Sequence, residues 1–237
     1  MDDSIRIRNL SVDDVHLWRI QLDPAPPEFH ELEETLSEGE RLRASNFATA
    51  ELGRRWTAAR GALRTILSLY MCVQPRSLLF ATDAYGKPRI IGAGQPLFFN
   101  LSHTGRLAIV AIAAEEFIGV DAEMIRPDIE WEALARRVFT DAEVRSIASL
   151  PSECRIPAYF SCWTRKEAYL KALGVGLSAP LNNFQVSFRP DETARLVWVE
   201  DRPEEPQLWS FLDVGEPNMA AAVAVRQQRS TLRRFHF

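Results

Sequence analysis

The feature that most constrains the fold is the period of the hydrophobic pattern, which changes from helical to strand-like twice along the chain. Residues 51–71 repeat apolar side chains every three or four positions, as an amphipathic helix does. Three apolar runs of strand length follow, at residues 97–103, 107–114 and 117–125. The order then recurs, because helical patterns at residues 131–150 and 160–177 precede further short apolar runs. The sequence therefore predicts an α+β protein.

The segments around these blocks complete the prediction. Short strands are expected near residues 5–10 and 15–22, and a helix over 31–47. Residues 23–29, DPAPPEF, are expected to form a loop because prolines do not fit inside a helix or a central strand. The stretch SLLFATDAYGKPRIIG predicts two strands joined by a turn at Tyr85–Pro88. The last strands are expected at residues 184–190, 194–200, 207–213 and 219–225.

The repeated order of helix and strands indicates two lobes of similar size, which would meet near residues 115–125. We place an N-terminal α+β lobe at residues 1–117 and a C-terminal α+β lobe, with the candidate metal site, at residues 118–237. Neither an internal repeat nor a flexible linker marks this boundary.

Charge and cysteine content exclude several classes of protein. The 28 Lys and Arg residues against 32 Asp and Glu give a formal charge of −4, so no overall basic field exists to attract nucleic acid. Cys72, Cys154 and Cys162 have neither metal-ligand spacing nor an even number, which favours a reducing, cytoplasmic compartment. No apolar run is long enough for a signal peptide or a membrane helix, so we expect a soluble protein without a membrane partner.

Two carboxylates lie two residues apart in the strand-like stretch IGVDAEMI. Asp121 and Glu123 would project from one face of the sheet, where they can share a cation. Mg²⁺ binds one or two protein carboxylates and leaves sites for water or phosphate. An exposed strand face near a turn explains the pattern equally, because acidic residues are mostly solvated.

Ser102 and His103 close the run FFNLSHTG, where apolar residues give way to small polar ones. A hydroxyl and an imidazole at a strand end can donate hydrogen bonds to phosphate oxygens. A serine that caps a turn and a locally satisfied histidine remain the alternative. No nucleophile-elbow motif surrounds Ser102, so we do not interpret it as a nucleophile.

The stretch FSCWTRKEAYLKALGVGL predicts a helix with Glu167 and Lys171 at positions i and i+4, the spacing of an ordinary surface ion pair. Trp163 lies one turn earlier on the same face, and Lys166 adds a second cation beside the carboxylate. Glycines at the end of the helix allow close backbone approach. These features favour a site for a charged substrate over a surface ion pair.

Three motifs stand in a characteristic order. They are N-L-S-H at Asn100–His103, G-V-D-A-E at Gly119–Glu123 and W-T-R-K-E-A-Y-L-K at Trp163–Lys171. The helix expected over residues 51–71 has a basic face with Arg54, Arg55, Arg60 and Arg64, and we call it the arginine-rich helix. With this helix and the Tyr85–Pro88 turn upstream, the chain resembles the 4′-phosphopantetheinyl transferases of the surfactin-synthetase-activating (Sfp) type. The resemblance covers residues 41–177, and residues 178–237 match only in strand character.

The resemblance implies two pseudo-symmetric α+β lobes that hold coenzyme A in the cleft between them. It implies Mg²⁺-dependent transfer of the phosphopantetheine arm to a serine of an apo acyl or peptidyl carrier protein, with release of adenosine 3′,5′-bisphosphate. Mg²⁺, with Mn²⁺ as a substitute, would bind Asp121, Glu123 and Glu167. Asp121, Glu167 and Lys171 would be the catalytic residues. Glu167, directly or through a metal-bound water, would accept the serine proton, and Lys171 would assist the leaving group.

Further positions match those that hold the coenzyme A phosphates in that family. They are Arg43, Arg60, Arg64, Lys87, Ser102, His103 and Lys171. Two departures stand out. Glu40 replaces a lysine, which shifts the grip on the 3′-phosphate to Arg43 and the arginine-rich helix. Ala122 between the two carboxylates leaves the third metal ligand open.

The sequence leaves the carrier open, because carriers of fatty-acid, polyketide and nonribosomal peptide synthesis all present a serine. A site built from both lobes of one chain needs no second subunit, so we expect a monomer. Two other functions stay open from the residues. One is a non-catalytic module that binds coenzyme A or carriers, and the other is a metal-dependent phosphohydrolase.

Overall fold

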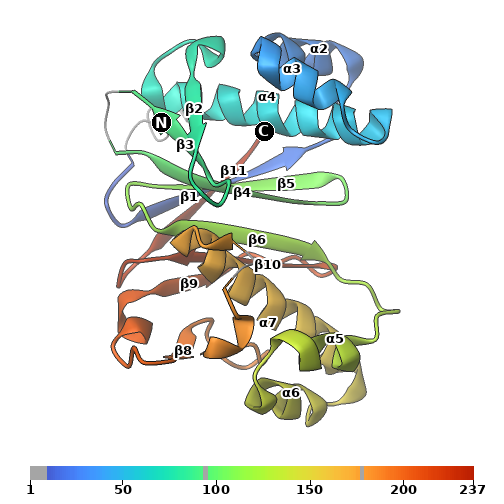
Figure 1. Cartoon of the computed structure of the whole chain (residues 1–237), viewed down its shortest axis with the longest axis vertical. Coiled ribbons are helices and arrows are strands. Elements are labelled where there is room, and N and C mark those ends of the chain that lie inside the picture. The colour runs from blue at the N-terminus through green and yellow to red at the C-terminus, as the bar shows by residue number, and fades with distance from the viewer. Residues whose placement is uncertain (1–9, 93–95, 177–178) are drawn as a thin grey trace.

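The structure is a computed structural model that describes residues 10–92, 96–176 and 179–237 (Figure 1). It has four layers: helices, a first sheet, a second sheet and helices again (Figure 1). The α+β prediction is confirmed. In the described ranges, no helix is long and apolar enough to cross a membrane.

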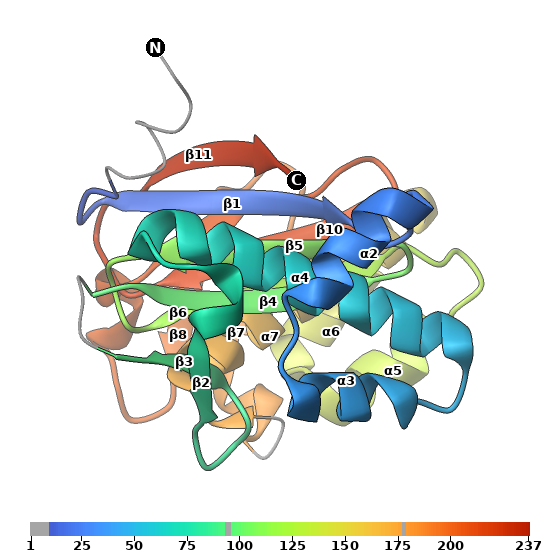
Figure 2. The same cartoon turned by 90° about the horizontal axis from the view of Figure 1, so that it is seen from above.

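The first half is a helical layer on a four-stranded sheet. The sheet has the order β11-β1-β5-β4, with bounds Thr231–His236, Asp14–Gln21, Leu107–Ala113 and Phe98–Thr104. Helix α4 (Ala50–Met71) packs along it, and α2 (Pro26–Glu34) and α3 (Glu38–Ser45) lie against α4 (Figure 2). The core between them holds every second residue of β1 and β5, such as Trp18, Ile20 and Val110. This alternation follows from the two-residue period of a strand.

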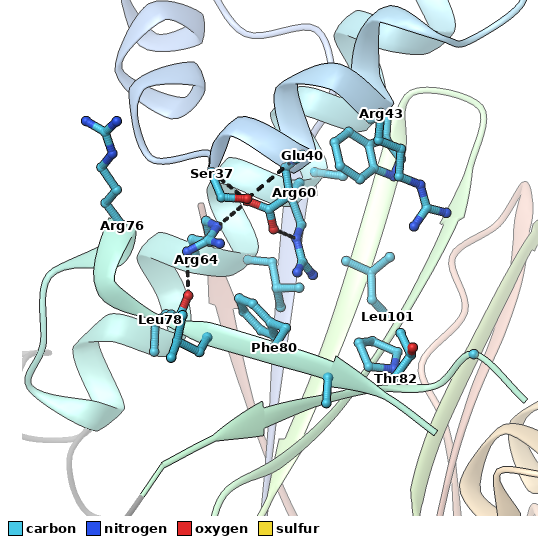
Figure 3. A pocket seen from close by; sticks show the side chains of 18 of the residues that line it. Ser37, Glu40, Arg43, Arg60, Arg64, Arg76, Leu78, Phe80, Thr82 and Leu101 are labelled. Atoms are coloured by element: carbon cyan, nitrogen blue, oxygen red, sulfur yellow. Dashed lines mark hydrogen bonds and ion pairs between the residues drawn. The ribbon is translucent and has the colours of Figure 1, made fainter. Parts of the chain in front are cut away.

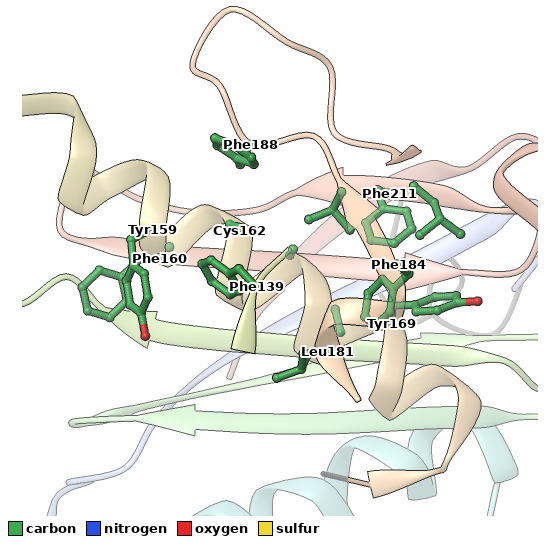
Figure 4. Packing of buried hydrophobic residues seen from close by; sticks show 14 of the residues in the cluster. Phe139, Tyr159, Phe160, Cys162, Tyr169, Leu181, Phe184, Phe188 and Phe211 are labelled. Atoms are coloured by element: carbon green, nitrogen blue, oxygen red, sulfur yellow. The ribbon is translucent and has the colours of Figure 1, made fainter. Parts of the chain in front are cut away.

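The second half repeats this arrangement. Its sheet has the order β6-β10-β9, with bounds Ile118–Met124, Met219–Val225 and Ser210–Asp213. Helix α7 (Ser152–Leu173) packs against it, next to α5 (Trp131–Val138) and α6 (Asp141–Ala148). Aromatic side chains fill this core, and Figure 4 shows Tyr159 and Phe160 of α7 with Phe139, Phe184 and Phe211 near the helix. Burial of this apolar surface holds α7 in place.

The two sheets face each other through a third cluster. It contains the other faces of the central strands, including Val15, Leu17, Ile109, Val120 and Val223. Two small hairpins complete the fold, β2 (Leu79–Thr82) with β3 (Pro88–Ile91) and β7 (Phe184–Val186) with β8 (Leu196–Val199). Short 3₁₀ helices stand at Pro75–Ser77, Leu181–Asn183 and Glu205–Leu208.

The last strand returns to the first sheet. Strand β11 pairs in parallel with β1, so Thr231–His236 lie in the layer formed mainly by the first half of the chain. No sequence expectation included this strand. The proposed lobes at residues 1–117 and 118–237 stay a prediction, and that boundary lies between β5 and β6, where the chain leaves the first sheet.

Helix boundaries differ from the sequence expectations in a consistent way. The loop expected over residues 23–29 is wrong in its second half, because α2 begins at Pro26; proline fits the first turn of a helix. The single helix expected over 31–47 is two helices, and Ser37 caps the second by accepting a hydrogen bond from Glu40 N. The helix expected over 131–150 likewise divides at Thr140, which caps α6.

The remaining strands overlap their predicted ranges, although β7 ends at Val186, and Gln207 and Leu208 belong to a 3₁₀ helix before β9. Helix α7 begins at Ser152, earlier than the predicted start at Phe160. The strand expected near residues 5–10 falls outside the described ranges except for Leu10.

Candidate active site

The site forms where β6 crosses α7 with no side chain between the two backbones. A Cβ atom on Gly119 would lie 2.1 Å from the carbonyl oxygen of Ala168 and 2.4 Å from the amide nitrogen of Ala172, so only glycine fits. Alternate residues of a strand share a face, and Asp121 and Glu123 therefore lie on the side of β6 that meets α7.

Polar side chains of β4 join the two sheets at this point. β4 and β6 are edge strands of different sheets, and every second side chain of β4 accepts a hydrogen bond from a backbone N–H of β6. The pairs are Asn100 with Val120 (2.9 Å), Ser102 with Ala122 (3.3 Å) and Thr104 with Met124 (3.0 Å). This ladder satisfies an exposed strand edge and carries Ser102 into the cleft. As candidate site residues, Asn100 and Thr104 were missed, although their period of two in an apolar strand was a usable signal.

Asp121 is the centre of a hydrogen-bond network. Lys171 Nζ lies 2.6 Å from Asp121 Oδ1 and 3.2 Å from Ser102 Oγ, and Ser102 Oγ donates to Asp121 Oδ1 over 2.9 Å. Asp121 is 4% exposed, yet its Oδ2 has no hydrogen-bond partner among the described residues. One oxygen of this carboxylate is thus doubly engaged and the other is unsatisfied, which is costly in a buried position.

Glu167 is the second buried carboxylate of the site. It is 7% exposed, and its Oε1 has no hydrogen-bond partner in the described part of the chain. Burial, followed by the charge of Asp121, raises the pKa of Glu167 to about 7 although Lys171 acts in the opposite direction. Burial and Asp121 also raise the pKa of Glu123. The site gathers more negative charge than its one lysine compensates.

These groups line one pocket of about 300 Å³. Its wall consists of Leu101, Ser102, His103, Asp121, Glu123, Trp163, Glu167 and Lys171. Three segments far apart in the sequence therefore meet, as the motifs predict. We call this space the carboxylate pocket.

A larger pocket of about 690 Å³ adjoins it (Figure 3). We call it the arginine pocket, because its lining includes Arg43, Arg60, Arg64 and Arg76 together with His103. Leu101 and His103 line both pockets, which makes them neighbours. The sequence offered no motif for Arg76.

Glu40 lies inside the arginine pocket, between two of its cations (Figure 3). Its carboxylate accepts hydrogen bonds from Arg60 Nε and Arg64 Nε, at 2.5 and 2.8 Å. Despite burial, these guanidinium groups and the N–H of Ser37 hold the pKa of Glu40 at about 2. Arg64 is 3% exposed and also donates to the carbonyl oxygens of Pro75 and Leu78. The basic face that the sequence assigned to α4 is therefore partly internal, and Arg43 and Arg76 make fewer such contacts.

Two lysines lie elsewhere than the sequence predicts. Lys166 is fully buried and pairs with Glu143 at 2.9 Å on another face of α7, so the expectation of a second cation beside Glu167 is wrong. Lys87 lies outside the lining of both pockets. Its Nζ donates to the backbone oxygens of Ile118 and Ala172 at 3.0 and 3.1 Å.

The carboxylate oxygens of this pocket are the kind of ligand that a hard cation such as Mg²⁺ prefers. In the described ranges, no three His, Cys, Asp or Glu side chains are close enough to hold a metal ion by themselves. Mg²⁺ needs fewer, because it usually binds one or two carboxylates and completes its shell with water and substrate phosphates. The unpartnered oxygens of Asp121 and Glu167, with the nearby Glu123, supply such a partial ligand set.

The carboxylates, the lysine and the adjoining arginine pocket are groups whose chemistry suits a phosphorylated substrate. The sequence profile described as the 4′-phosphopantetheinyl transferase superfamily matches residues 117–224. The "4′-phosphopantetheinyl transferase HetI" of Nostoc sp. is 42% identical over 217 residues, which cover 90% of this chain and 88% of that protein. The "4′-phosphopantetheinyl transferase Sfp" of Bacillus subtilis is 30% identical over 66% of this chain and 68% of its own length.

The chain belongs to the 4′-phosphopantetheinyl transferase superfamily, with an Sfp-like organisation. It is an enzyme of the transferase class, as the resemblance of its motifs implies.

Proposed function

We propose that this protein transfers the 4′-phosphopantetheine arm of coenzyme A to a serine hydroxyl of an apo acyl or peptidyl carrier protein and releases adenosine 3′,5′-bisphosphate. The observation that carries the proposal is the carboxylate pocket. Two buried carboxylate oxygens, on Asp121 and Glu167, have no hydrogen-bond partner among the described residues and share this pocket with the ammonium of Lys171. Family membership supplies the reaction class, and the pocket supplies groups suited to it.

The arginine pocket supports coenzyme A as the donor. Coenzyme A carries a diphosphate and a 3′-phosphate, and guanidinium groups bind phosphates through paired hydrogen bonds. Arg43 and Arg76 are the cations with the most freedom to do so, whereas Arg60 and Arg64 are engaged by Glu40. His103, which lines both pockets, is placed to contact a phosphate between them.

Asp121, Glu123 and Glu167 would supply a partial ligand set for Mg²⁺ in the carboxylate pocket, with Mn²⁺ as a substitute, and water and substrate phosphates would complete it. The ion would neutralise charge on the diphosphate and on the departing phosphate. Asp121 is oriented for this role by Ser102 and Lys171, which both donate to its Oδ1 and leave Oδ2 available.

Glu167 is the candidate general base. Without a metal ion, burial and the charge of Asp121 raise its pKa to about 7, and a bound cation would lower that pKa and keep the carboxylate ionised so that it can accept a proton. In the reaction, the serine oxygen forms a bond to the phosphorus that bears the pantetheine arm. The bond from that phosphorus to the 5′-phosphate oxygen breaks, and Glu167 takes the serine proton. Lys171 places a positive charge in the pocket that offsets the charge of the leaving group.

The partner would be an apo carrier protein, and the enzyme would act as a monomer in the cytoplasm. The three cysteines are free thiols, which supports a reducing compartment. Carriers of fatty-acid, polyketide and nonribosomal peptide synthesis are all candidates.

Intact mass spectrometry tests the proposal. Incubation with coenzyme A, Mg²⁺ and an apo carrier should add one phosphopantetheine arm to the carrier, and a chelator should abolish the gain. A carrier with its serine replaced by alanine is the matched control. No mass gain across a panel of fatty-acid, polyketide and peptide carriers would refute the proposal. Hydrolysis of coenzyme A without carrier modification would indicate a phosphohydrolase instead.

A further inference from the structure

The side chain of Lys87 connects three elements. It starts in the turn between β2 and β3 and ends between β6 and α7, where its Nζ donates to Ile118 O and Ala172 O. Ile118 is the first residue of β6, and Ala172 lies in the last turn of α7. Both acceptors are backbone carbonyls, so the ammonium binds the main chain of two elements rather than another side chain.

The turn that carries Lys87 is itself well ordered by hydrogen bonds. Asp83 Oδ1 accepts from the backbone N–H groups of Tyr85 (3.0 Å) and Lys87 (2.9 Å), and Asp83 N donates to Lys87 O over 3.0 Å. This aspartate turn fixes the backbone on both sides of the lysine. Lys87 therefore extends from a defined base.

The turn also packs on the end of α7. Gly174 ends the helix with a positive φ of 69°, and a Cβ on it would lie 3.2 Å from Asp83 Oδ2 and 3.7 Å from Lys87 Cδ. The hairpin and the helix end are thus in direct contact around the lysine.

The electrostatic setting suits a cation held for structure. The last carbonyls of a helix carry partial negative charge and lack partners within the helix, and an ammonium at that end stabilises them. Burial lowers the pKa of Lys87 to about 8, which is the cost of removing it from water.

The three connected elements belong to the two pockets of the active site. The hairpin forms a wall of the arginine pocket through Leu79, Phe80, Ala81, Thr82, Gly86 and Pro88. Strand β6 carries Asp121, and α7 carries Glu167 and Lys171 in the carboxylate pocket. The hydrogen bonds of Lys87 to these elements therefore hold one pocket in a fixed position relative to the other.

We propose that Lys87 is a positioning residue that fastens the β2–β3 hairpin to the start of β6 and the end of α7, and so holds the arginine pocket in register with the carboxylate pocket. This assignment replaces the expectation, drawn from the resemblance, that Lys87 binds a coenzyme A phosphate. The kinetic part of the proposal rests on the proposed function, whereas the structural part does not.

Hydrogen exchange of the free protein tests the structural part. Lys87→Met keeps the length of the side chain and removes its donors, and it should speed amide exchange in residues 79–91 by about tenfold while the rest of the fold keeps its protection. Arg89→Met is the matched control. It removes one positive charge from the same hairpin, but Arg89 is exposed, and its ion-pair partners are the exposed Glu116 at 3.1 Å and Asp83 at 3.9 Å. Exchange in Lys87→Met equal to that in wild type or in Arg89→Met would overturn the proposal, since a residue that only binds ligand does not protect the free hairpin.

The transfer assay tests the kinetic part. Loosening the hairpin should raise the KM for coenzyme A about tenfold with kcat changed less, because binding must then order the hairpin. Lys87→Arg, which keeps a charged donor, should restore most of both the exchange protection and the KM. A KM in Lys87→Met that matches wild type would overturn the coupling of the pockets. If wild type itself transfers nothing, the proposed function fails, and the exchange experiment still decides whether Lys87 fastens the hairpin.

Discussion

Helix α7 carries two lysines, Lys166 and Lys171, and each forms an ion pair with a carboxylate of another element. The two pairs differ in how many of their charged atoms have hydrogen-bond partners. On one face, Lys166 Nζ binds Glu143 at 2.9 Å and donates to the carbonyl oxygens of Leu181 and Phe184. Glu143 in turn accepts from the backbone N–H groups of Thr140 and Val186. Every charged atom of this pair has partners, so it can only stabilise the lobe.

On the other face, Lys171 binds Asp121, but within the described part of the chain the buried Asp121 Oδ2 and the neighbouring Glu167 Oε1 have no hydrogen-bond partner. We call the pair of Lys166 closed, because its charged atoms all have partners, and the site around Lys171 open, because two carboxylate oxygens there lack them in the described ranges. The closed pair faces the core and the open one faces the cleft. Unsatisfied polar groups are normally rare in folded proteins, and they are expected where a ligand completes them. The comparison shows that unpaired charged atoms, more than the charges themselves, distinguish the functional face of the helix.

The largest expected effect separates the two lysines by stability. Lys166→Met should lower the free energy of unfolding by about 3–5 kcal/mol, because it leaves Glu143 charged and buried without a counter-ion. Lys171→Met, the same change on the same helix, should cost less than Lys166→Met, because Lys171 is 30% exposed and its charge is already partly solvated in the folded protein. Urea unfolding followed by circular dichroism measures both. Equal losses in the two variants would break the comparison.

The next effect separates the pairs by activity. Asp121→Ala and Glu167→Gln should each lower kcat/KM for carrier modification by at least about 100-fold while the fold survives, since each removes a group that acts on the substrate. Glu132→Gln, an exposed change on α5, is the control and should retain wild-type activity. Full activity in either cleft variant would refute the assigned roles.

The sequence predicted the open face better than the closed one. The spacing of Asp121 and Glu123 on a strand, and of Glu167 and Lys171 on a helix, determines which side chains project together, so the carboxylate pocket was foreseeable from the motifs. The position of Lys166 on the core side of α7 could not be predicted in this way. Its partner Glu143 belongs to another helix, so no spacing within α7 indicates the pair.

Contacts between distant parts of the chain also explain why strand β11 was not predicted. Strand β11 is mostly polar and is held by parallel pairing to β1 and by the stacking of Phe235 on Trp18 at 4.8 Å, neither of which leaves a local signal. The helix breaks at Ser37 and Thr140 were readable, since a Glu follows each by three residues in a capping box. The interpretation there gave too much weight to the apolar spacing.

A further effect should appear in the pH dependence of stability without metal. Glu167 releases its proton near pH 4.5 when unfolded and near pH 7 when folded, so the folded state binds more protons between these values. The free energy of unfolding should therefore fall as the pH rises from 4.5 to 7, by up to about 1.4 kcal/mol per pH unit. Glu167→Gln should flatten this slope, and Glu132→Gln should not. Urea midpoints in the presence of a chelator measure it, and identical slopes in wild type and Glu167→Gln would show that the open face carries no such strain.

The smallest effect concerns the ladder that supports the open face. Thr104 Oγ1 accepts from Met124 N at the exposed end of the seam between β4 and β6. Thr104→Val keeps the shape and removes the acceptor, and it should cost about 1 kcal/mol or less because water can replace the hydroxyl there. Since Ser102 still fixes Asp121, kcat/KM should fall less than about threefold. Thr104→Ser, which keeps the hydroxyl, should match wild type in both measurements. A loss of activity in Thr104→Val as large as that in Asp121→Ala would mean that the whole ladder, rather than Ser102 and Lys171, positions the carboxylate, and the open pair would then depend on the seam between the sheets.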